Sequence, residues 1–189
     1  KDLTNIGRVG RKWFGEGFEI NQEQEFSFNF PNIDTSTPIK LSINTASSAI
    51  TTTTFKVLAN GQEVGTMSFP PLAQNSSILF YESSLPTNTT FPSAENVKIK
   101  LSYNNNGVPG SKGYLDKIML TAKRNLQAYG KQFQFQYDLA NSSLGIANYT
   151  ISNANGISQV WDVTDIYNVT KVENTNQTSF SFKANLCEL

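Results

Sequence analysis

The segment 97–103 reads Val97-Lys98-Ile99-Lys100-Leu101-Ser102-Tyr103, in which apolar and polar side chains alternate without a break. A period of two places every apolar side chain on one face of a β-strand, as in an antiparallel sheet with one buried face. The same alternation recurs in four other segments, which we therefore expect to be strands: Phe26–Phe30, Ile39–Ile43, Phe133–Tyr137 and Ser179–Phe182.

Turn residues punctuate these segments. Asn60-Gly61, the strongest short hairpin signal, separates a run through Phe55 and Val57 from the run Glu63–Met67. Short strands spaced roughly 10–15 residues apart and divided by Pro and Gly are typical of a sandwich. The sequence therefore predicts an all-β fold, an antiparallel β-sandwich that is jelly-roll-like and has few or no helices.

One segment, 114–126, fits two patterns. Its apolar residues match a helical stripe at i, i+3, i+4, i+7 and i+11, and those at 118, 120 and 122 match a strand equally well. Because no capping residue stands well placed before Tyr114, we favour a long strand and keep the helix as the alternative.

The chain of 189 residues and 20.9 kDa is long enough to bury about 70% of its unfolded surface. It has no internal repeat and no long linker, so we expect a single β-sandwich domain over residues 1–189. The residues after about 153 are expected to form an extension that docks on the sandwich or leads elsewhere.

Composition excludes several classes of function. Fifteen basic residues balance fifteen acidic ones, which argues against binding nucleic acid or an anionic membrane surface. No apolar run approaches the about 20 residues of a membrane span. The chain has no His, so Ser-His-Asp and Cys-His nucleophile pairs and the usual catalytic zinc sites are absent. We therefore expect this chain itself not to be an enzyme.

The densest unusual segment is 8–18, which places cations beside aromatic rings. Arg8, Arg11, Trp13 and Phe14 could together bind an anionic or sugar ligand, because Arg and Trp stack on ring faces. The alternative, which we favour, is an N-terminal loop that its aromatic residues pin to the sandwich.

A second candidate surface lies at Trp161, Asp162 and Asp165. The two carboxylates could hold calcium, although Asp at such positions more often bonds its own backbone at a turn; no other cofactor is expected. Exposed rings would suit a sugar ligand, and the candidates are Tyr81, Tyr103, Tyr167 and Trp161. The competing interpretation is that such rings are core residues.

Three motifs occur in order along the chain: Gly7–Gly10 with Trp13-Phe14-Gly15-Glu16, Tyr114–Ile118 leading to Arg124-Asn125-Leu126, and Val160-Trp161-Asp162-Val163-Thr164-Asp165. Together they resemble the region before the catalytic domain in PorU-type sortases of the type IX secretion system, which are cysteine peptidases of the gingipain family. The resemblance also favours a strand at 114–126.

The resemblance implies an exported parent protein at the outer membrane or cell surface of a Gram-negative bacterium. Such a peptidase removes C-terminal sorting domains from cargo and couples the new end to an anchoring lipopolysaccharide. Its catalytic Cys and His would lie in a domain downstream of this chain, and Cys187 is not one of them. The implied partners are that peptidase domain and, beyond it, cargo or shuttle proteins.

Three hypotheses follow. The chain is a non-catalytic scaffold or docking domain of such a peptidase; or it is a carbohydrate-binding module; or, least favoured, it is a glycosidase that uses carboxylates near Glu16 and Glu19.

Overall fold

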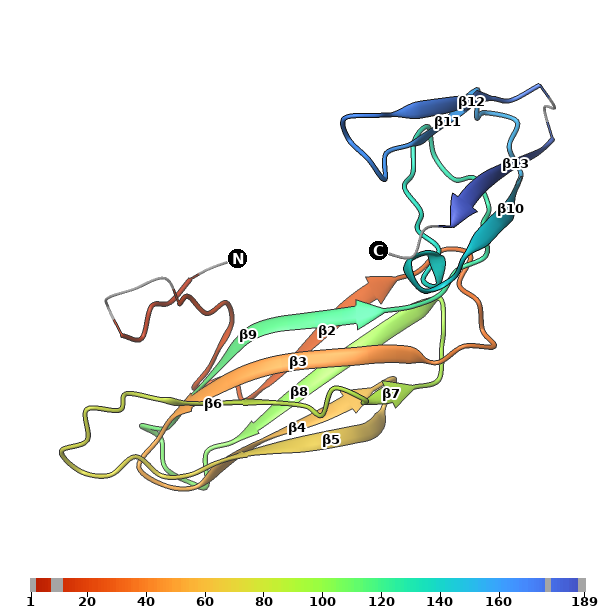
Figure 1. The fold of residues 1–189 in the computed structure, drawn as a ribbon. Helices are drawn as coiled ribbons and strands as arrows, with labels where there is room; N and C mark the ends of the chain where they lie inside the picture. Colours follow the sequence, from red (N-terminus) through yellow and green to blue (C-terminus); the bar gives the residue numbers. More distant parts are fainter. Residues whose placement is uncertain (1–2, 8–11, 176–177, 187–189) are drawn as a thin grey trace. The chain divides into compact units, whose positions relative to one another are not determined.

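Two antiparallel sheets face each other in the first part of the chain (Figure 1). The computed structural model describes residues 3–7, 12–175 and 178–186, and it divides into two compact units, Lys1–Arg124 and Asn125–Leu189. The first sheet of the first unit has the order β1-β9-β3-β6, and β7 pairs with the start of β3. Its strands are β1 (Gly17–Phe18), β3 (Ile39–Ser48), β6 (Tyr81–Ser84), β7 (Thr90–Phe91) and β9 (Lys112–Thr121).

The second sheet of this unit has the order β2-β8-β4-β5. Its strands are β2 (Glu23–Asn29), β4 (Thr53–Ala59), β5 (Gln62–Phe69) and β8 (Asn96–Asn104). Along the chain, β1, β3, β6, β7 and β9 belong to one sheet, while β2, β4, β5 and β8 belong to the other, so the polypeptide repeatedly crosses between the layers. This is the strand order of a jelly roll, and the predicted fold class is confirmed.

The core of the first unit fills the space between its two sheets. The alternating strand β8 turns Val97, Ile99, Leu101 and Tyr103 inward, and each is at most 2% exposed. These side chains meet inward residues of the facing sheet and of β4, which form one cluster: Ile39, Leu41, Ile43, Phe55, Val57 and Leu115. The period of two therefore builds the sandwich.

Most predicted strands are confirmed at the expected places. Asn60 and Gly61 join β4 to β5 with φ of 47° and 82°, the left-handed conformation that a two-residue hairpin needs. The ambiguous segment 114–126 is a strand from its start to Thr121, as part of β9, which pairs with β3 along its length. The helix alternative is thus wrong.

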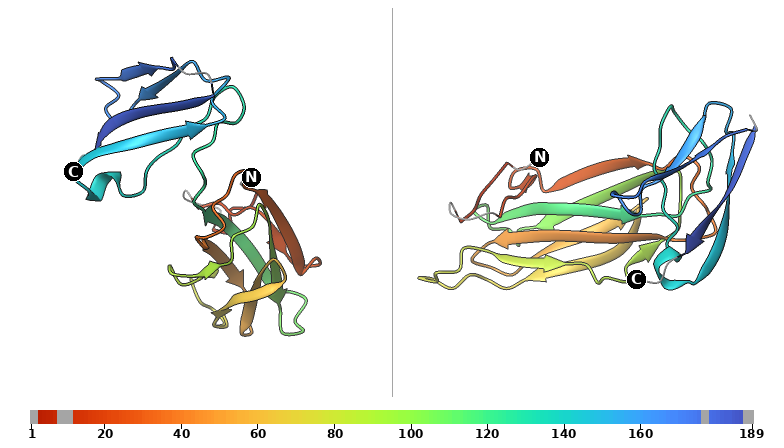
Figure 2. Two further views of the ribbon diagram at one scale, coloured as in Figure 1. Left: turned by 90° about the vertical axis from the view of Figure 1, so that its right-hand side faces the viewer. Right: turned by 45° about the horizontal axis from the view of Figure 1, so that its top comes forward.

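The second unit contains two separate two-stranded sheets (Figure 2). One pairs β10 (Gly145–Ser152) with β13 (Ser179–Leu186), and the other pairs β11 (Gln159–Asp162) with β12 (Thr170–Glu173). A single turn of 3-10 helix, η1, spans Ala140–Ser142. A small core of Ala128, Ile151, Ala154 and Phe180 holds this unit together.

One strand prediction is wrong. Phe133–Tyr137 alternates perfectly but forms no ladder. Phe133 and Phe135 instead pack as rings against the small core, and Phe135 lies 5.8 Å from Tyr149 and 6.3 Å from Phe182 between ring centroids. Aromatic packing without a neighbouring strand explains the alternation here.

The two compact units divide after Arg124, and the expected extension after about residue 153 stays a prediction. Whether the chain folds as one domain stays a prediction. Among the described residues, no helix is long and apolar enough to cross a bilayer.

Candidate functional site

The residues of the N-terminal candidate do not share one environment. Phe14 is 1% exposed and lies in a cluster with Ala46 and Tyr114; its ring centroid is 5.4 Å from that of Phe80 and 5.8 Å from that of Tyr114. Trp13, its neighbour, is 46% exposed. Phe14 therefore packs on the outer side of the first sheet and offers no ring face to a ligand, whereas Trp13 does.

Backbone hydrogen bonds join this segment to β9. The Gly15 N–H donates to the Leu115 carbonyl at 2.8 Å, and the Leu115 N–H donates to the Glu16 carbonyl at 2.9 Å. Gly17 in β1 then pairs with Tyr114. The described end of the first motif, residues 13–16, thus lies beside the second motif, about a hundred residues away in the sequence.

The ammonium group of Lys12 adds an electrostatic contact between the N-terminal segment and β9. Lys12 Nζ lies 3.0 Å from Asp116 Oδ2 in β9, 3.4 Å from Glu82 Oε1 in β6 and 5.6 Å from the centre of the Phe14 ring. The hydrogen bond to Asp116 raises the pKa of Lys12 above its usual value. Lys12 is therefore bound within the fold, while Arg8, Arg11 and Cys187 lie outside the described residues.

The carboxylates of the second candidate each bond their own turn. Asp162 Oδ1 accepts the Thr164 N–H at 3.0 Å, and Asp165 Oδ1 accepts the Tyr167 N–H at 2.9 Å. The bonds from Thr164 lower the pKa of Asp162. Within the described ranges, no three acidic or Cys side chains gather as a metal site would require. These Asp residues shape the turn after β11, and a role for them in calcium binding stays a prediction.

The β11–β12 hairpin carries an unusual amount of exposed apolar surface. Its exposed apolar residues, which we call the hairpin surface, are Trp161, Val163, Ile166, Tyr167, Val169 and Val172. Trp161 is 58% and Tyr167 94% exposed, so these two rings alone present roughly 300 Å² if a whole aromatic side chain counts about 200 Å². An apolar area of this size is comparable with the largest apolar patch of a typical monomer, and such patches are often functional.

The other ring candidates are placed differently. Tyr103 is 2% exposed, and its hydroxyl lies 2.8 Å from Ser47 Oγ, inside the sandwich. Tyr81 is half-buried against the same core. The Tyr103 ring is therefore closed to a ligand in solvent, and Tyr81 is largely covered. Among the four ring candidates, Trp161 and Tyr167 on the hairpin are the most exposed.

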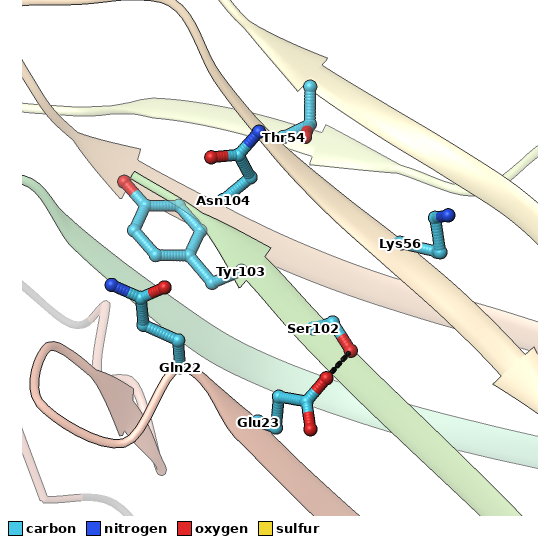
Figure 3. A pocket seen from close by; sticks show the side chains of 7 residues that line it. All are labelled: Gln22, Glu23, Thr54, Lys56, Ser102, Tyr103 and Asn104. Carbon is cyan, nitrogen blue, oxygen red and sulfur yellow. Dashed lines mark hydrogen bonds between the residues drawn. The ribbon is translucent and has the colours of Figure 1, made fainter. Parts of the chain in front are cut away.

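A polar depression of about 370 Å³ lies on the second sheet and was missed by the sequence analysis (Figure 3). Glu23 on β2 accepts hydrogen bonds there from Ser102 Oγ at 2.9 Å and pairs with Lys100 at 2.7 Å; the bond to Lys100 lowers its pKa. Most of the residues that line the depression are polar residues on the outer face of the sheet. The lining residues are Gln22, Glu23, Thr54, Lys56, Ser102, Tyr103 and Asn104. With one carboxylate among these residues, the depression has no acid–base pair for glycoside hydrolysis.

Comparison with known proteins identifies the fold. No protein-family model and no curated protein matches this chain. The crystal structure of dimeric latent PorU from Porphyromonas gingivalis superposes on the whole chain with a TM-score of 0.80 at 17% identity. The fold is that of a segment of latent PorU. This chain spans 18% of the length of that PorU chain.

Two other likenesses are partial. A carbohydrate-binding module, CBM36, solved with calcium and xylotriose, matches 57% of this chain with a TM-score of 0.37 and 17% identity. The insecticidal δ-endotoxin Cry8Ea1 from Bacillus thuringiensis matches 57% with a TM-score of 0.41 and 24% identity. Neither of these two likenesses is close enough to support an argument.

Proposed function

We propose that this chain is a non-catalytic β-sandwich segment of a larger exported cysteine peptidase of the gingipain family, similar to the sortase of the type IX secretion system. The observation that carries the proposal is the superposition of the whole chain on a fraction of PorU. In this role the segment is a scaffold beside a peptidase domain of the same polypeptide, which would supply the catalytic Cys and His.

The chemistry of the chain supports a non-catalytic role. The chain has no imidazole to take a proton from a nucleophile. Around Phe14 and Tyr114 the described residues of the two motifs form a packed contact between the N-terminal segment and β9. Bond cleavage is therefore assigned to a neighbouring domain.

The gene and the full-length protein test this proposal. The reading frame beyond Leu189 should encode a gingipain-like domain with a Cys and a His, and the full-length protein should cleave a cargo protein at its C-terminal sorting domain. The 189-residue chain should leave the same cargo intact. An unrelated downstream sequence, or cleavage by the 189-residue chain alone, would refute the proposal.

The proposed location is the outer membrane or cell surface of a Gram-negative bacterium. Intact cells treated with an added protease should lose the parent protein, while a cytoplasmic marker persists. Protection of the parent protein in intact cells would contradict this location.

The hairpin surface is the part of the segment best suited to docking. Trp161 and Tyr167 are large, rigid and exposed, as residues that anchor interfaces commonly are. Its proposed partner is the peptidase domain, with cargo or shuttle proteins as other candidates. Trp161→Ala should weaken binding between the separately produced segment and peptidase domain at least tenfold, and Trp13→Ala, on the other unit, should not.

The same rings support a second candidate function, carbohydrate binding, because an exposed Trp face can stack on a pyranose ring. Titration with bacterial and plant glycans should then show saturable binding that Trp161→Ala abolishes and Trp13→Ala retains. If no glycan binds, this candidate is excluded and the docking role is unaffected.

A further inference from the structure

The strand β12 has an edge that meets no other strand among the described residues. Among the described residues it pairs with β11 on one side only (Figure 1), and all four of its residues, Thr170 to Glu173, are exposed. An isolated two-stranded ribbon is marginally stable in water, and an uncovered edge is a template for a further strand.

The register of the hairpin fixes which peptide groups face that edge. The Asn174 N–H donates to the Ser158 carbonyl at 2.8 Å, so residues 158 and 174 form a hydrogen-bonded pair. Hydrogen-bonded pairs alternate along an antiparallel ladder. In the register observed, Val172 therefore directs its peptide groups at β11, whereas Lys171 and Glu173 direct theirs outward.

The two outward-facing residues carry opposite charges. Lys171 and Glu173 lie on the same face of the ribbon, and Lys171 Nζ is 2.9 Å from Glu173 Oε1. An antiparallel strand of the same sequence, centred on Val172, would place Glu173 opposite Lys171 and Lys171 opposite Glu173. The edge is thus complementary to itself.

We propose that β12 pairs with β12 of a second copy of this chain across a two-fold axis. Lys171 and Glu173 of the two copies form two hydrogen-bonded pairs with four backbone hydrogen bonds and two salt bridges. The Val172 side chains of the two copies meet at the axis, in a pair without hydrogen bonds, where side chains are closest. The two ribbons become one four-stranded sheet.

The charges select this register over its neighbours. A slip of two residues in either direction places Lys171 opposite Lys171 or Glu173 opposite Glu173, and like charges directly opposite are destabilising. A slip of one residue sets an outward-facing peptide group against an inward-facing one and forms no ladder. Charge and hydrogen bonding therefore agree on a single pairing.

Charge reversal tests the pairing in the 189-residue chain by sedimentation velocity over a concentration series. The wild type should form a reversible dimer. Lys171→Glu and Glu173→Lys should each weaken self-association by about tenfold or more, because each creates two like-charge pairs in the dimer. An equimolar mixture of these two variants should form a heterodimer at least as stable as the wild-type dimer.

The mixture separates pairing between chains from folding of the hairpin. Each variant also loses the Lys171–Glu173 pair within its own strand, and mixing cannot restore that, so recovery in the mixture comes only from contacts between chains. Lys183→Glu, at an exposed position of β13, is the matched control. Mixing it with Glu173→Lys should not restore dimerisation of Glu173→Lys. A monomeric wild type, or a dimer that ignores both reversals, would overturn the proposal.

Discussion

Phe14→Ala tests whether the Trp13-Phe14-Gly15-Glu16 motif acts by packing. The side chain is 1% exposed and contacts the rings of Phe80 and Tyr114. Burial of a Phe contributes about 2–3 kcal/mol and each ring pair about 1 kcal/mol, so the substitution should cost about 4 kcal/mol. Trp13→Ala removes a larger ring that is 46% exposed, and it should cost about 1 kcal/mol.

Hydrogen exchange measures this cost locally, because the N-terminal segment can detach without unfolding the sandwich. The amides of Gly15 and Leu115 are bonded across the junction. Their protection should fall by up to about a thousandfold in Phe14→Ala, since about 1.4 kcal/mol corresponds to a factor of ten, while amides in β4 and β8 stay protected. If Trp13→Ala lowers this protection as far as Phe14→Ala, the packing argument is refuted.

Further outcomes follow from the structure. Gly113→Ala should cost at least about 1–3 kcal/mol in urea unfolding, because its Cβ would lie 2.6 Å from Phe55 and 2.8 Å from Tyr103; an unchanged midpoint would contradict this. Tyr103→Phe should cost about 1 kcal/mol, because Ser47 loses a buried hydrogen-bond partner, and a stability equal to wild type would argue against that bond. The fragment 1–124 should unfold cooperatively on its own, as judged by circular dichroism, because its sheets are complete within it; a non-cooperative melt would show otherwise. The lowered pKa of Asp162 stabilises the fold above about pH 4, and this contribution should disappear as pH falls below that and be absent in Asp162→Asn, as followed by Trp161 fluorescence in a Trp13→Phe background.

The sandwich could be predicted because its strands carry the signal locally. Val97–Tyr103 and the Asn60-Gly61 turn each determine their own conformation through alternation and positive φ, and both are found as expected. Phe133–Tyr137 has the same alternation without a strand to pair with. An alternation of apolar and polar residues indicates that one side of a segment is buried. It does not indicate whether a neighbouring strand or other side chains bury that side.

The arrangement of the candidate residues could not be predicted, because it depends on contacts between distant segments. Nothing near Trp13 and Phe14 tells which of the two is buried; that is decided by Tyr114 and Phe80, which cover only Phe14. The polar depression at Glu23 likewise exists because β2 lies beside β8. In the sequence, the depression is marked only by the alternating polar residues of each strand. Every exposed face of a sheet has such residues, so they do not locate a depression.

The pairing of the first two motifs explains why they occur together in one chain. An edge segment laid along β9 needs a ring to fill the space beside Tyr114, a cation for Asp116 and free backbone groups at Gly15 and Glu16 for Leu115. Phe14, Gly15 and Glu16 of the motif meet the first and last of these requirements, and Lys12, which precedes Trp13, meets the second. In this chain the described residues of the two motifs therefore act through contacts of the N-terminal segment with β9. Their resemblance to PorU-type proteins therefore bears on the fold, and evidence for the peptidase chemistry has to come from a domain that contains a Cys and a His.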